Sequence, residues 1–193
     1  MKKMHACILC MVLAVPISVA ASQFLMHTRN AFQGASASCE TVEHSMLTSS
    51  GDSAVGSTSS YLYRAGKMEG GTYSGPVCAV EFHIRRIGSP TGDITAFLYD
   101  NSGTSPNNQL LASTTTIDVS TLATGNTWVS FEFDGEVTSA LWVVLRCDVN
   151  DLSNYVNWRN SGAFWSKGDY TSSNGTGWSL GNQRKMTYKL YSP

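Results

Sequence analysis

The stretch GSPTGDITAFLYD, residues 88–100, indicates the fold class, because it joins a turn to a strand with residue types that favour each. Glycine tolerates positive φ and proline fixes φ at about −65°, so the first five residues are typical of a turn. After the turn, Ile94, Ala96 and Leu98 alternate with their neighbours, which is the period of a strand. The stretch therefore predicts a turn that leads into a strand.

Short strand-like runs with turn residues between them recur on both sides of this stretch. They are spaced by roughly ten residues, and none has the sustained period of a helix. The further runs cover residues 61–68, 78–86, 110–116, 128–133, 141–146, 155–159 and 186–191, with another near 164–165. The pattern predicts an all-β protein, an antiparallel β-sandwich that is jelly-roll-like.

The composition favours an extracellular β-protein and argues against two classes of partner. Charged residues make up only 14% of the 193 residues, against about a quarter in typical domains. The formal net charge is −1, with no basic stripe. We therefore expect no electrostatic binding to nucleic acid or to anionic lipid.

The N-terminal region predicts secretion. Lys2 and Lys3 precede an apolar run over residues 6–21, which is typical of a secretory signal peptide at 1–21. The run is too short to span a bilayer, so no membrane span is expected in the mature chain. Residues 22–60 are rich in Ser, Ala and Gly without periodicity, which predicts a flexible leading segment. Residues 61–193 then form the β-sandwich domain of a secreted or cell-surface protein.

Three cysteines, Cys39, Cys78 and Cys147, would remain after cleavage. Because Cys78 and Cys147 both lie beside strand-like runs, we predict a disulfide between them in an oxidising compartment. The alternative is that both are reduced residues in the core.

The strand runs and their turns carry a family resemblance. Residues 80–191 resemble the choice-of-anchor type of extracellular β-sandwich module, which occurs in bacterial secreted and surface proteins. The resemblance implies the fold but no catalytic residues. The motifs that carry it are FHI at 82–84, GSPTG at 88–92, SP at 105–106, DVSTL at 118–122, FEF at 131–133, NYV at 154–156, GW at 177–178 and YKLY at 188–191.

Aromatic residues after position 154 are the best functional lead. Aromatic rings with nearby amide and guanidinium groups can stack on sugar faces and bind hydroxyls. The structural alternative is core packing, and strand alternation makes Trp158 a core candidate. The candidate ligand-binding residues are Tyr155, Asn157, Trp158, Arg159, Trp165, Tyr170 and Trp178.

The segment Glu132-Phe133-Asp134-Gly135-Glu136 resembles the Glu-x-Asp-x-Glu motif of laminarinase-type β-glucanases, which sets three carboxylates on one strand face. However, Asp-Gly is a strong hairpin signal, so we expect a turn that carries Glu136 away from Glu132. The hypothesis of a glycoside hydrolase is therefore secondary, and we expect the chain not to be an enzyme.

Metal sites are weakly indicated. The histidines lack the spacing of a zinc site. Asp148, Asn150 and Asp151 gather oxygen atoms in one loop, which would suit calcium, although turns rich in Asp and Asn are common without it. No other cofactor is expected.

These observations favour a secreted, non-catalytic module for extracellular binding or adhesion, with a carbohydrate or another cell-surface ligand as the partner. The alternatives are a structural surface or assembly component that binds no small ligand and, less favoured, the glycoside hydrolase.

Overall fold

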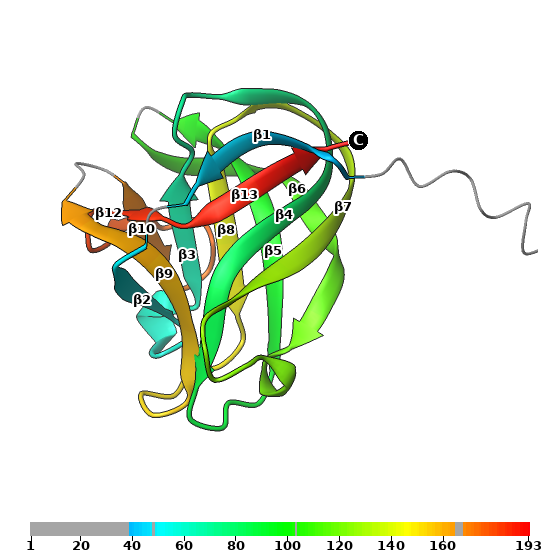
Figure 1. Ribbon diagram of the computed structural model, residues 1–193. Coiled ribbons are helices and arrows are strands. Elements are labelled where there is room, and N and C mark those ends of the chain that lie inside the picture. Colours follow the sequence, from blue (N-terminus) through cyan, green and yellow to red (C-terminus); the bar gives the residue numbers. More distant parts are fainter. Residues whose placement is uncertain (1–38, 48, 103, 165–167) are drawn as a thin grey trace, which may run out of the picture. The chain divides into compact units, whose positions relative to one another are not determined.

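The computed structural model describes residues 39–193 except residues 48, 103 and 165–167. Within this part of the chain, two antiparallel β-sheets pack face to face around one main apolar core (Figure 1). The only helical elements there are two 3-10 turns, η1 (Ser59–Tyr61) and η2 (Val119–Thr121). The predicted all-β antiparallel sandwich is confirmed.

The first sheet is built around its longest strand, β4. Five strands follow the order β1-β13-β4-β9-β12, while β2 pairs with β9 and β7 pairs with β4. The strands are β1 (Thr41–Met46), β2 (Gly51–Val55), β4 (Tyr73–Ile87), β7 (Thr127–Ala140), β9 (Tyr155–Phe164), β12 (Arg184–Met186) and β13 (Tyr188–Ser192).

The second sheet has six strands in the order β11-β10-β3-β8-β5-β6. They are β3 (Tyr63–Lys67), β5 (Asp93–Ser102), β6 (Ser105–Asp118), β8 (Trp142–Cys147), β10 (Asp169–Ser172) and β11 (Ser179–Leu180). The edge of this sheet meets the first sheet through side chains, since Thr114 Oγ1 on β6 donates to the carbonyl of Glu132 on β7 at 3.1 Å.

The turn and strand predicted at residues 88–100 are confirmed. Gly88 and Gly92 have φ values of +67° and +127°, which non-glycine residues rarely adopt. A Cβ atom at Gly88 would also collide with the side chain of Asn154, whose Oδ1 accepts from the amide of Ser89 at 2.7 Å. Strand β5 then lies between β8 and β6.

Aromatic rings on the inner faces fill the core of the sandwich. Phe82, Phe131 and Trp158 are fully buried. The ring centroid of Phe82 lies 5.5 Å from that of Phe131 and 5.0 Å from that of Trp158, both edge to face. Such pairs add attraction to the burial of apolar surface, so these three rings stabilise the core beneath the first sheet.

The prediction of a flexible segment up to residue 60 is wrong for its described part. Strand β1 pairs with β13 and strand β2 pairs with β9, so both belong to the first sheet. The segment is poor in large apolar residues, yet Met46 and Val55 are buried in the core. The sandwich therefore begins well before residue 61, while the predicted signal peptide lies outside the described residues.

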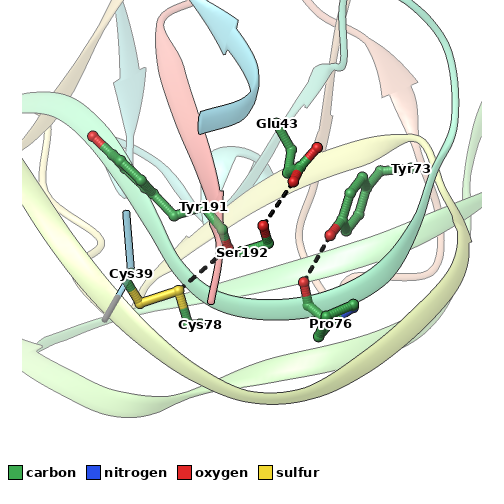
Figure 2. The surroundings of a disulfide bond; sticks show 7 residues. All are labelled: Cys39, Glu43, Tyr73, Pro76, Cys78, Tyr191 and Ser192. Atoms are coloured by element: carbon green, nitrogen blue, oxygen red, sulfur yellow. Dashed lines mark hydrogen bonds between the residues drawn. A yellow bond between two sulfur atoms is a disulfide. The ribbon is translucent and has the colours of Figure 1, made fainter. Parts of the chain in front are cut away.

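The predicted disulfide between Cys78 and Cys147 is also wrong. The disulfide joins Cys39 to Cys78, as Figure 2 shows, and Cys147 is a buried free thiol. Cys147 cannot reach Cys78, because it ends β8 of the second sheet with its side chain in the core. Cys78 is half-buried on β4, with its Sγ atom 3.5 Å from the carbonyl oxygen of Tyr191 on β13. Burial raises the pKa of the Cys147 thiol to about 11.

Polar contacts reinforce the N-terminal strand near the disulfide (Figure 2). Ser192 Oγ donates to a carboxylate oxygen of Glu43 at 2.6 Å, which links β13 to β1. Tyr73 Oη donates to the carbonyl of Pro76 at 2.7 Å within β4. The contact of Ser192 with Glu43 therefore ties β1 to the C-terminal strand, and the disulfide ties Cys39, which lies just before β1, to β4.

Candidate functional site

The predicted aromatic ligand surface does not exist as one face. Trp158 points into the core, is fully buried, and donates its Nε1 proton to the carbonyl of Thr187 at 2.7 Å. It therefore cannot contact a ligand, and its prediction as a binding residue is wrong. Trp165 lies outside the described residues.

Tyr170 lies on β10 of the other sheet and Trp178 just before β11, within an aromatic cluster on the outer face of that sheet. The ring of Tyr170 is 5.4 Å from that of Trp142, and the ring of Trp178 is 5.7 Å from that of Tyr99, both edge to face. Burial raises the pKa of Tyr99 to about 12. These contacts are those of packed side chains, and the cluster comprises Tyr63, Phe97, Tyr99, Trp142, Tyr170 and Trp178.

Tyr155, Asn157 and Arg159 share the outer face of β9, as strand alternation predicts, since Val156 and Trp158 between them are core residues. Asn157 is only 7% exposed, whereas Tyr155 and Arg159 are half-buried. This face belongs to the first sheet, so these residues and Trp178 lie on different sheets.

Two cavities flank the segment that runs from β11 to β12, and both use Gly181 and Asn182. The first has a volume of about 450 Å³ and the second about 430 Å³. The first is lined by Gly51, Asp52, Asn160, Gly162, Gly181, Asn182, Gln183 and Arg184. The second is lined by Ala54, Ser60, Tyr61, Arg64, Thr171, Ser172, Ser173, Gly177, Ser179, Leu180, Gly181 and Asn182.

A buried ion pair holds this segment in place. Asp169 at the start of β10 accepts from Arg64 Nη2 at 2.5 Å and from Arg64 Nε at 3.1 Å. The same carboxylate accepts from the main-chain amides of Asn182 at 3.1 Å and Arg184 at 2.9 Å. Because both charged side chains are almost completely buried, the carboxylate fixes the backbone that separates the two cavities.

The backbone of this segment has two further constraints. A Cβ atom at Gly181 would collide with the carboxylate of Asp169, so only glycine allows the close approach. Gln183 adopts φ +56°, a left-handed conformation that costs free energy in a non-glycine residue. The wall that the cavities share, Gly181 and Asn182, is therefore fixed by Asp169, and the strained residue Gln183 lines the first cavity.

The second cavity combines an aromatic ring with hydroxyl groups. Tyr61 is 40% exposed and Leu180 is 47% exposed, so both present apolar surface at its rim. The exposed side chains of Ser60, Ser173 and Ser179, with the Asn182 amide, supply hydrogen-bond donors and acceptors. This combination suits a ligand that has both apolar faces and hydroxyl groups.

Two carboxylates of the predicted calcium loop, those of Asp148 and Asp151, already have protein partners. Asp151 accepts from the amide of Ser153 at 2.7 Å and from the side chain of Asn154 at 2.8 Å. Asp148 forms an ion pair with Arg146 at 2.7 Å. No group of three potential metal ligands occurs among the residues that the structure describes, so calcium in this loop remains a prediction.

The hairpin predicted at Asp134-Gly135 is wrong, because β7 runs through both residues without a break. Glu132, Asp134 and Glu136 consequently lie on one exposed face of the strand. Neither of the two cavities includes any of the three carboxylates.

Sequence reasoning missed Arg64, Asp169 and the segment at 181–184. The Gly-Asn pair at 181–182 is a turn signal that could have located the loop. No local signal could have paired Arg64 with Asp169, because they are 105 residues apart in the chain.

Comparisons with protein families, with curated proteins and with solved structures find no match to this chain. Within residues 39–193, leaving aside the five that are not described, there is no helix of the length and apolar character needed to cross a bilayer.

Proposed function

We propose that this chain is a secreted, non-catalytic β-sandwich module that binds a carbohydrate in the two cavities beside residues 181–184. The observation that carries the proposal is the second cavity, where the exposed side chain of Tyr61 shares the lining with the exposed hydroxyl groups of Ser60, Ser173 and Ser179. Sugars present apolar C–H faces and hydroxyl groups, so an aromatic ring with convergent polar groups is a complementary surface.

The rigidity of the shared wall supports this assignment. A preorganised site loses less conformational entropy on binding than a mobile loop does. Here the buried carboxylate of Asp169 holds the amides of Asn182 and Arg184 before any ligand arrives. Both volumes, about 450 and 430 Å³, fall in the range of about 300–1,000 Å³ that is typical of small-ligand sites.

Secretion is a separate part of the proposal, with its own support. The apolar N-terminal run after Lys2 and Lys3 supports a signal peptide. The disulfide between Cys39 and Cys78 supports an oxidising compartment, since such bonds persist mainly outside the cytosol.

A glycan array followed by titration of the best oligosaccharide tests the function. Trp178 lies beside the second cavity, between Gly177 and Ser179 of its lining, so tryptophan fluorescence should change on binding. Asn182→Ala should weaken binding, because its side chain lines both cavities. Asn107→Ala is the matched control, since Asn107 is exposed on β6 at the far edge of the second sheet.

Two outcomes would favour the alternatives. If the intact chain binds no glycan and its fluorescence stays constant, a structural surface component is the better hypothesis. The hydrolase hypothesis gains one observation, the common exposed face of Glu132, Asp134 and Glu136. It requires β-glucan hydrolysis by the intact chain that disappears in Glu132→Gln.

A further inference from the structure

Two arginines on the outer face of the first sheet share a single carboxylate. Arg85 Nη2 on β4 donates to Asp52 Oδ2 at 2.8 Å, and Arg159 Nη1 on β9 donates to Asp52 Oδ1 at 2.9 Å. The side chains of the two arginines are 31% and 20% exposed, so solvent reaches both. Strand pairing brings these side chains together, because Asp52 on β2 lies directly opposite Arg159 on β9.

The two guanidinium groups offer more hydrogen-bond donors than the surrounding residues offer acceptors. Each carries five N–H donors, yet among the described residues they make only three hydrogen bonds, two to Asp52 and one from Arg159 to the carbonyl of Ser49. The Nε atoms of both arginines are enclosed and have no acceptor there. Because these Nε atoms are enclosed, the donors left for an external oxyanion are the remaining Nη hydrogens, which outnumber the three acceptor contacts that the two side chains make.

The charges around the pair also favour an anion. Two guanidinium groups against one carboxylate leave a local excess of positive charge. Lys189 nearby is already neutralised by Glu81 at 2.8 Å. Burial lowers the pKa of the neighbouring His83, and the positive charge of Arg159 lowers it further. Since the whole chain has a net charge of −1, this excess is local.

We propose that Arg85 and Arg159 form a binding site for an oxyanion, the carboxylate or sulfate group of an acidic polysaccharide. Guanidinium groups bind such planar or multi-oxygen anions through paired charged hydrogen bonds. Asp52 also lines the first cavity, so the anion site adjoins the proposed sugar site. The identity of the ligand as an acidic glycan rests on the proposed function, whereas the oxyanion site itself does not.

Titration at fixed ionic strength with dextran sulfate, polygalacturonate and neutral dextran tests the proposal and separates sulfate from carboxylate. Arg85→Gln and Arg159→Gln should each weaken binding of the preferred acidic polymer by about tenfold, the worth of one charged hydrogen bond. Arg146→Gln is the matched control. It removes the same charge from an exposed ion pair on the second sheet and should change binding by less than about twofold. Asp52→Asn should strengthen binding, because it removes the competing carboxylate.

The outcomes separate this inference from the proposed function. Equal losses in Arg85→Gln and Arg146→Gln, or no preference of the intact chain for acidic over neutral polymers, would overturn the inference and leave the sugar site standing. If no polysaccharide binds, the proposed function fails. The anion site is then tested by itself, from the thermal stabilisation of the chain by inorganic sulfate. Thermal stabilisation by sulfate that is lost in Arg85→Gln supports the site, and the same stabilisation in that variant overturns it. Circular dichroism of each variant confirms that it is folded.

Discussion

Replacing Asp169 with asparagine should destabilise the chain strongly. The side chains of Asp169 and Arg64 are 0% and 3% exposed, so the substitution would leave a buried guanidinium without its counter-charge. Breaking a buried pair from one side typically costs about 3–5 kcal/mol. The same change leaves one neutral acceptor oxygen, so neither amide keeps a charged acceptor, and the amides of Asn182 and Arg184, which bond to different oxygens, cannot both keep their bond.

Urea unfolding of the intact and variant chains measures this loss directly. Arg146→Gln is the control, because its partner Asp148 is 45% exposed and such surface pairs contribute about 0–1 kcal/mol. The double variant Arg64→Met, Asp169→Leu should not recover the stability of the intact chain, since it removes the unpaired charge but leaves the amides of Asn182 and Arg184 without their acceptor. A loss below about 1 kcal/mol for Asp169→Asn would refute the reasoning that this pair anchors the segment.

Three further results are expected. Phe131→Ala should lower the free energy of unfolding by about 3–5 kcal/mol in urea melts, as for buried aromatic residues generally, and a loss below about 1 kcal/mol would contradict its inward orientation. Cys39→Ser should cost about 2–4 kcal/mol in the same assay by freeing the loop that the bond to Cys78 closes, whereas reducing agent should have no effect on that variant. Burial raises the pKa of Cys147 to about 11 from 9.0, so the folded chain binds this proton more tightly and stability should fall as pH rises from 9 to 11. Cys147→Ala should lessen that fall, and an unchanged pH profile would argue against the shift.

The fold was predictable because local patterns and tertiary structure agree over most of the chain. Ile94, Ala96 and Leu98 alternate in the sequence and are fully buried in the structure. The agreement fails where pairing overrides a local signal. Gly135 sits in the middle of β7, opposite Val77 of β4, and a Cβ atom there would lie 2.8 Å from Leu111. This glycine allows close packing, and the Asp-Gly pair is not a turn.

The candidate site was not predictable, because it depends on contacts between distant residues. The aromatic residues after position 154 are close in sequence, but alternation directs Trp158 into the core, and Trp178 packs in a separate cluster against the second sheet. Similarly, the spacing of cysteines gives no information about which strands become neighbours. Strand β1 brings Cys39 to β4, and only the pairing of β1 with β13 and of β13 with β4 explains that approach.

The disulfide between Cys39 and Cys78 has a mechanical consequence. A pulling force applied to the chain ahead of Cys39 passes through the covalent bond directly into β4, the long strand that contacts β13, β7 and β9. Strands β1 and β2 lie within the loop that the bond closes and bear none of the load. A tether at that end would therefore pull on the most extensively paired strand of the first sheet, and the weaker edge strand would not peel away first.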